Sequence, residues 1–169
     1  MIRKIYFKEI VFNNFKYNDF DKIISKKGLF IFPSGPGLSL LEKEIEYQNS
    51  LKEADFVFFD SGYFVLLLRI FKNIKVNKFS GYKFLEKFFS YLKKNNNKSV
   101  FCIDPSSLLS KSNQRYFDKL GISKIYNYSA PKYNHRNIKD NKLLKKLNII
   151  KPNFILTNIG GGTQEILGL

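Results

Sequence analysis

The stretch NFILTNIGGGTQE, residues 153–165, carries the strongest indication of the fold. An apolar run with several β-forming residues (153–159) leads into three consecutive glycines and then into the polar residues Thr163, Gln164 and Glu165. A strand that runs into a glycine turn and then into a helix is the repeating unit of a parallel sheet. The stretch therefore favours an α/β fold, provided that the same order recurs along the chain.

The same order does recur, because short apolar runs alternate with longer segments of helical period. The predicted strands are 28–33, 55–59, 99–104, 124–129 and 153–159, and the clearest predicted helices are 63–71, 84–92 and 140–149. We predict a Rossmann-like, mostly parallel sheet with helices on both faces. We expect one α/β domain over 1–169, since 169 residues suffice for one core but not for two.

Two helices carry expectations about packing. Leu41, Ile45 and Ala54 mark the expected apolar side of an amphipathic helix that follows the first predicted strand. The helix over 63–71 is apolar all round, which predicts that other elements cover most of its sides.

The composition is strongly basic, with a net charge of +15. Lysine supplies 25 of the 29 basic residues, whereas nucleic-acid readers favour arginine for bidentate contacts, so the charge is weak evidence for nucleic-acid binding. A basic surface favours anionic partners in general, including phospholipid headgroups and sugar-nucleotide diphosphates. Cys102 is the only cysteine and His135 the only histidine, so neither a disulfide framework nor a zinc site is expected.

No secretory signal is visible, because charges interrupt the apolar positions of the amino terminus. The most apolar stretch, YFVLLL at 63–68, ends at Arg69 and falls far short of the roughly 20 residues that span a bilayer. We therefore expect a cytoplasmic protein.

Three polar glycine turns follow predicted strands: PSGPG (33–37), DSG (60–62) and GGGTQE (160–165). Ligands of parallel sheets bind beyond the carboxyl ends of the strands, so the three turns are expected to converge on one crevice. GGGTQE is either an ordinary turn or a phosphate cradle of backbone N–H groups, although it matches neither usual nucleotide fingerprint. Gln164 and Glu165 add groups that could bind sugar hydroxyls or a base.

Asp60 also has two interpretations. It could cap the helix that follows it, a role for which aspartate is well suited. Alternatively, it could act as a general base at the mouth of the crevice and take a proton from a hydroxyl nucleophile.

Cys102 is expected in the core, and His135 is expected in a surface loop without a catalytic role.

Five motifs together resemble a known family. PSGPGL, DSGYFVLLLR, FSGYKFL, YSAPKY and GGGTQEILG occur in this order at suitable separations. Over 28–169 they resemble the WecG/TagA/CpsF glycosyltransferases, particularly a branch with PSGPGL and DSG motifs. The closing Gly-Gly-Gly-x-Gln-Glu is similar to that family's Gly-x-Pro-x-Gln-Glu signature.

The resemblance implies an inverting transfer of an N-acetylmannosamine-type or related sugar from UDP to a polyprenyl-diphosphate-linked acceptor. The reaction belongs to cell-surface polysaccharide synthesis at the inner membrane face, so the protein would be peripheral to that membrane and require no metal or other cofactor. Asp60 matches the family's base, and Gln164 and Glu165 match its Gln-Glu pair. Ser34 lies near the family's Thr-x-Asn stretch, which is Pro-Ser-Gly here, so a different sugar is expected. The predicted substrate-binding residues are Ser34, Gly35, Ser61, Gly62, Ser80, Gly81, Gly160, Gly161, Gly162, Gln164 and Glu165.

Relatives continue beyond the glycine loop with a basic segment, so we expect this chain to be truncated at its carboxyl end, the alternative being a naturally reduced form. Two further function classes stay open. One is a non-catalytic nucleotide- or lipid-phosphate-binding module. The other is a nucleic-acid-binding α/β protein, which a steep loss of affinity with salt would identify. The sequence leaves open whether the protein forms a homo-oligomer.

Overall fold

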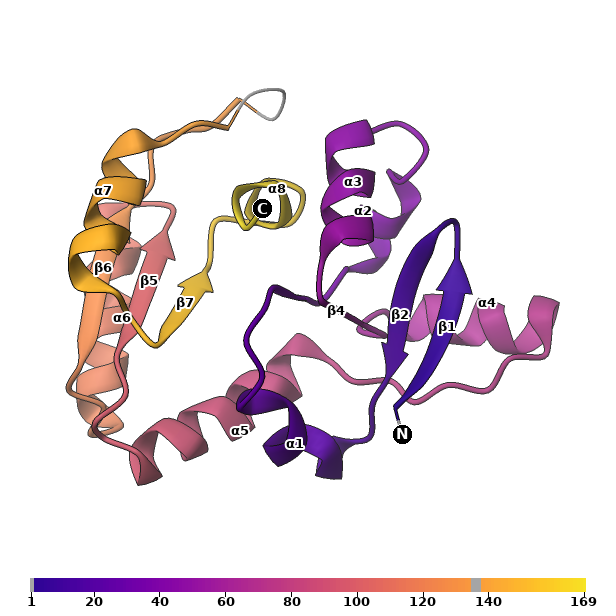
Figure 1. Ribbon diagram of the computed structural model, residues 1–169, viewed down its shortest axis with the longest axis horizontal. Coiled ribbons are helices and arrows are strands. Elements are labelled where there is room, and N and C mark those ends of the chain that lie inside the picture. Colours follow the sequence, from indigo (N-terminus) through magenta and orange to yellow (C-terminus); the bar gives the residue numbers. More distant parts are fainter. Residues whose placement is uncertain (1, 135–137) are drawn as a thin grey trace. The chain divides into compact units, whose positions relative to one another are not determined.

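The computed structural model describes residues 2–134 and 138–169, so His135 and Arg136 lie outside the described residues (Figure 1). The strands are β1 (Arg3–Phe7), β2 (Ile10–Asn14), β3 (Phe30–Ile31), β4 (Phe56–Phe58), β5 (Val100–Asp104), β6 (Ile125–Ser129) and β7 (Phe154–Thr157). The helices are η1 (Tyr17–Asp19), α1 (Phe20–Ile24), α2 (Gly35–Ser39), α3 (Ile45–Glu53), α4 (Gly62–Lys72), α5 (Gly81–Lys94), α6 (Ser107–Lys119), α7 (Asn141–Ile150) and α8 (Thr163–Leu167).

The chain divides into two compact units. The first runs to Phe88 and includes Gly168–Leu169, and the second is Phe89–Leu167. Each unit has its own sheet and its own apolar core. The mixed α/β class with parallel strand pairing is confirmed, but the strands are shared between two sheets. The assignment of the whole chain to one domain stays a prediction.

In the first unit the strand order is β1-β2-β4-β3. β4 pairs in parallel with β2 and with β3, and Val57 is opposite both Phe12 and Ile31. β1 pairs antiparallel with β2 through the two-residue turn Lys8-Glu9, whose positive φ angles of 49° and 64° match the twist of a tight hairpin. The sequence did not predict this hairpin, because its turn contains neither glycine nor asparagine.

Phenylalanine rings fill the core of the first unit. The Phe58 ring stacks on Phe32 with centroids 4.4 Å apart and on Phe15 with centroids 5.0 Å apart. Phe79, which precedes the SG motif at 80–81, is buried in the same cluster. The core therefore fixes the chain on both sides of the DSG turn.

In the second unit β5 lies between β6 and β7, and both pairings are parallel. All five residues of β5 are buried, as expected for the central strand of a covered sheet. Its core contains Phe101, Ile103, Tyr128 and Leu143. The predicted strands 99–104, 124–129 and 153–159 are confirmed within a few residues.

Two expectations about helix packing are wrong. α3 begins only at Ile45, which is exposed, and its buried side is formed by Tyr47, Ser50 and Leu51 at three- and four-residue spacing. α4 buries Phe64 and Leu68 but leaves an apolar face uncovered, so other elements do not cover most of its sides. Within residues 2–134 and 138–169, no helix combines the length and apolarity that a bilayer crossing requires.

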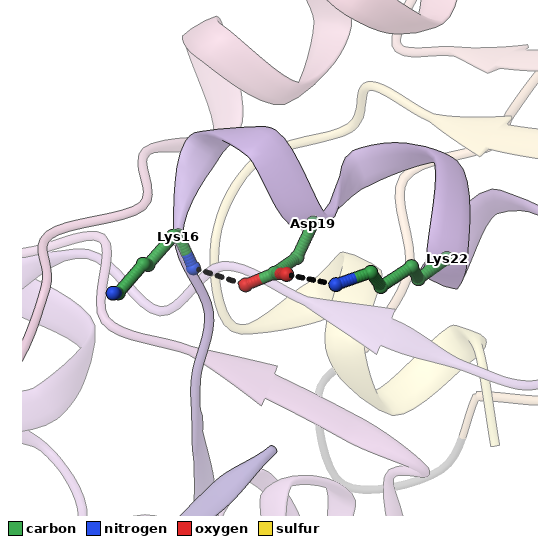
Figure 2. Close-up of polar contacts among 3 residues, drawn as sticks. All are labelled: Lys16, Asp19 and Lys22. Atoms are coloured by element: carbon green, nitrogen blue, oxygen red, sulfur yellow. Dashed lines mark hydrogen bonds and ion pairs between the residues drawn. The ribbon is translucent and has the colours of Figure 1, made fainter. Parts of the chain in front are cut away.

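A carboxylate organises the turn from β2 into η1 and α1. Asp19 accepts a hydrogen bond from the backbone N–H of Lys16 at 3.0 Å and another from Lys22 Nζ at 3.1 Å, as Figure 2 shows. The hydrogen bond from Lys16 is the main cause that lowers the pKa of Asp19. Phe20 and Ile23, which follow Asp19, are buried, so the turn directs α1 onto the core.

We predict that Asp19→Ala lowers the free energy of unfolding by about 1 kcal/mol, as for the loss of a helix cap. Because the folded pKa of Asp19 is lowered, its contribution is present above the unfolded value of about 3.9 and is lost as the pH falls through the folded pKa. Urea unfolding at several pH values measures both effects. Asp21→Ala, at an exposed aspartate of α1, is the control; equal losses in the two variants would contradict the prediction.

Candidate active site

The PSGPG and DSG loops of the first unit lie in contact. They follow β3 and β4, and the carboxyl ends of parallel strands meet at one edge of a sheet. Ser34 caps α2, its Oγ accepting from Gly37 N–H at 3.2 Å, and Ser61 caps α4 in the same way through Phe64 N–H at 3.2 Å. A Cβ atom at Gly35 would lie 3.2 Å from Ser61 Oγ, so glycine permits the close approach of the two loops.

The SG motif at 80–81 is bound to the DSG loop. Gly81 N–H donates to Asp60 Oδ1 at 3.1 Å, and Phe79 N–H donates to the Phe59 carbonyl at 2.9 Å. Ser80 Oγ accepts from Lys83 N–H at 3.3 Å in the first turn of α5. Six predicted site residues are thus brought together with Asp60 in the first unit: Ser34, Gly35, Ser61, Gly62, Ser80 and Gly81.

Asp60 does not cap the helix that follows it, so that interpretation is wrong. Ser61, one residue closer, caps α4, and the Asp60 carboxylate reaches the first residue of α5 instead. Asp60 is half-buried, and burial raises its pKa, while the Gly81 N–H and the charge of Lys78 act in the opposite direction. A carboxylate with a raised pKa accepts protons more readily near neutral pH, as a general base must.

Lys78 and Asn14 complete this group, although the sequence did not single them out. Lys78 Nζ lies 3.5 Å from the position that a Cβ at Gly62 would take, and its charge acts on Asp60. Asn14, at the end of β2, accepts from the backbone N–H of Asn77 at 2.8 Å and holds the segment before Lys78. In a chain with 25 lysines, only the proximity of Lys78 to the SG motif could have indicated it.

GGGTQE lies in the second unit, after β7. Gly160 and Gly162 have φ angles of 100° and 89°, which favour glycine strongly. Gly162 N–H donates to Glu165 Oε2 at 2.6 Å, and Gln164 Nε2 donates to Glu165 Oε1 at 3.3 Å. Glu165 is only 4% exposed, and burial raises its pKa. Its carboxyl group thus closes the loop, while Gly161 is exposed at the turn.

Asp104 supports the same loop and was not predicted as a site residue. It ends β5, is fully buried and accepts from Asn113 Nδ2 at 2.7 Å and from Asn158 Nδ2 at 3.0 Å. Asn158 stands two residues before Gly160, so the strand end positions the glycine turn. The convergence of this loop with the loops of the first unit on one crevice stays a prediction.

We predict that Glu165→Gln raises the free energy of unfolding near neutral pH. Because the folded pKa of Glu165 is raised, the stability linked to its protonation is fully present below the unfolded value of about 4.3 and is lost as the pH rises through the folded pKa. Glutamine keeps an oxygen for Gly162 N–H but never ionises.

Urea unfolding should therefore give similar stabilities for Glu165→Gln and wild type below about pH 4, with the variant more stable near neutral pH. Glu53→Gln, at an exposed glutamate of α3, should show no such divergence. A Glu165→Gln variant that is less stable than wild type at every pH would contradict the prediction.

The sequence was compared with known proteins and protein families. A search of the curated proteins found no match. A family model described as the glycosyl transferase WecG/TagA/CpsF family matches residues 6–168, nearly the whole of the 169-residue chain, and confirms the resemblance carried by the glycine motifs. The chain with the Asp60 site and the GGGTQE loop belongs to the WecG/TagA/CpsF family of glycosyltransferases.

Proposed function

We propose that the protein transfers an N-acetylmannosamine-type or related sugar from a UDP-sugar to a polyprenyl-diphosphate-linked acceptor in cell-surface polysaccharide synthesis. The family supports a glycosyltransferase with a sugar-nucleotide donor and an acceptor in general terms. The observation that carries the proposal is the half-buried Asp60, held by Gly81 beside the PSGPG and DSG loops of the first unit.

In the proposed reaction Asp60 takes the proton of the acceptor hydroxyl. The hydroxyl oxygen forms a bond to the anomeric carbon as the bond from that carbon to the UDP oxygen breaks, and the configuration inverts. The proton stays on the Asp60 carboxyl group, and UDP leaves with its negative charge. The raised pKa of Asp60 suits the proton transfer, and Lys78 places a positive charge beside it.

The glycine loops are the proposed donor site. Gly160 has a positive φ and open space where a Cβ would lie, so it has no side chain that would keep a phosphate away from the backbone of the turn. Gln164 is the proposed contact to the ribose, base or sugar, while the Glu165 carboxyl group holds the loop in shape. The proposed substrate-binding residues are Ser34, Gly35, Ser61, Gly62, Ser80, Gly81, Gly160, Gly161, Gly162, Gln164 and Glu165.

The proposed acceptor places the reaction at a membrane. A polyprenyl chain lies in the bilayer, so the enzyme works as a peripheral protein on the cytoplasmic face of the inner membrane. The net charge of +15 supports this location, because anionic headgroups attract basic proteins.

We predict that Asp60→Asn lowers the rate of sugar transfer by about 10²–10⁴-fold, as for the loss of a general base. Asparagine can still accept from Gly81 N–H, so the fold should persist. UDP release measured with the full chain and a polyprenyl-diphosphate acceptor in detergent gives the rate.

Asp19→Asn is the matched control for this experiment. Asp19 also accepts a backbone N–H, from Lys16, but lies outside the site, so its amide variant should keep the wild-type rate. In wild type, the rate of transfer should fall as the pH is lowered through the pKa of Asp60. The midpoint of this fall should lie at a higher pH than the ordinary pKa of aspartate, because burial raises the pKa of Asp60. Near-normal transfer by folded Asp60→Asn would remove Asp60 from the role of base.

We also predict that the protein binds UDP in preference to ADP and GDP, and that Gly160→Ala weakens UDP binding about tenfold or more. Gly121→Ala is the matched control, because Gly121 and Gly160 both have positive φ and both have open space where a Cβ would lie. Titration calorimetry measures the affinities. Equal affinities for the three nucleotides would count against a UDP site, and UDP binding without transfer would favour the non-catalytic module.

A further inference from the structure

The α4 helix presents an apolar face to solvent beside the proposed active site. Tyr63, Leu66, Ile70 and Phe71 are 70%, 49%, 63% and 75% exposed. Tyr63, Leu66 and Ile70 follow the three- and four-residue spacing of one helix face, and Phe71 lies next to it. Single exposed apolar residues are normal on proteins, but an exposed cluster of large ones marks an interaction surface.

Basic residues lie on α4 and in the segment that follows it. Residues 61–85 contain no aspartate or glutamate, and their basic residues are Arg69, Lys72, Lys75, Lys78 and Lys83. We call Arg69, Lys72, Lys75 and Lys78 the basic fringe of α4. Arg69 and Lys72 stand in the last turn of the helix, and both are exposed. Apolar side chains, a tyrosine and a fringe of cations together are the composition of a surface that lies on anionic lipid.

The charge of the basic fringe favours an anionic bilayer over a second copy of this chain as the partner of the α4 face. In a symmetric contact between two copies of this chain, the basic fringe of one copy would face the same basic fringe of the other copy. Residues 61–85 contain no acidic side chain that would offset this repulsion between like charges. The net charge of +15 adds to that repulsion. An anionic bilayer supplies negative headgroups for the fringe and an apolar interior for Leu66, Ile70 and Phe71.

A cavity of about 320 Å³ lies against the same helix. Leu67 and Phe71 of α4 line it together with Phe7 and Lys8 of the β1–β2 hairpin, which lies beside α4 in Figure 1. Ser61, the neighbour of Asp60, lines the cavity as well. The apolar cavity therefore connects the α4 face with the loop that carries the proposed base.

We propose that the α4 face and its basic fringe are the surface by which this protein lies on an anionic phospholipid bilayer, with the cavity beside Ser61 turned toward the lipid. This inference deepens the proposed function and rests on it in one respect, since the bilayer would present the lipid-linked acceptor on the side of Asp60. Membrane binding itself needs neither donor nor acceptor, so it is testable alone.

The test uses the full chain and sedimentation with vesicles of phosphatidylcholine, alone or mixed with phosphatidylglycerol. Wild type should bind the mixed vesicles, and added salt should weaken the binding. The double variant Leu66→Glu, Ile70→Glu should bind about tenfold or more weakly, because each change removes apolar contact and adds a repelled charge. Circular dichroism checks that the variant is folded.

The matched control is Leu144→Glu, Ile149→Glu, which places the same charges at exposed apolar positions of α7 and should leave binding nearly unchanged. Arg69→Gln, Lys72→Gln should weaken binding to the mixed vesicles and reduce its salt dependence. Lys111→Gln, Lys119→Gln on α6 is the control of equal charge.

Wild-type binding by the α4 variants, or equal losses in the α7 control, would overturn the proposal. A change of oligomeric mass by light scattering in the α4 variants, without a change in vesicle binding, would also overturn it and assign the face to contacts between copies. Calorimetric UDP titration separates the two proposals: vesicle binding that depends on α4 in a protein without UDP affinity would refute the donor site and keep the membrane surface.

Discussion

A central strand with parallel neighbours on both sides is the constraint on which each unit depends. β4 lies between β2 and β3, and β5 lies between β6 and β7. Parallel neighbours require crossover segments, and the carboxyl ends of the parallel strands meet at one edge of the sheet. An aspartate stands at that edge in both units, but Asp104 is fully buried between two asparagine amides, whereas Asp60 is half-buried and has one backbone donor. Of these two aspartates, Asp60 has the exposure that proton exchange with a substrate requires.

The sequence predicted most helices and strands, because apolar periodicity reports directly which residues face a core. The predicted helices 84–92 and 140–149 correspond to α5 (Gly81–Lys94) and α7 (Asn141–Ile150). The β1–β2 hairpin escaped prediction because β1 begins with the charged residues Arg3 and Lys4, and because Lys8-Glu9 replaces the usual turn residues. Local sequence patterns were therefore enough to predict a helix or strand when the residues that determine it lie within that helix or strand.

Contacts between distant residues could not be predicted in this way. Asp60 stands next to α4 in the sequence, so helix capping was a natural interpretation, yet its partner Gly81 is 21 residues away. Ser61 already supplies the cap of α4, which leaves the Asp60 carboxylate free to reach α5. The uncovered face of α4 is a second example, because an apolar sequence predicts a preference for burial but does not identify what covers the helix.

The segment after the DSG loop contributes both to the proposed sugar transfer and to the proposed membrane binding. Lys78 carries a positive charge beside Asp60, and it also belongs to the basic fringe of α4. An acceptor with a diphosphate group is repelled by an anionic lipid surface, and the absence of acidic residues from 61–85 leaves the local cations free to offset that repulsion. A basic segment that follows the loop of the proposed base can therefore attract the membrane and stabilise the charged substrates at the same place.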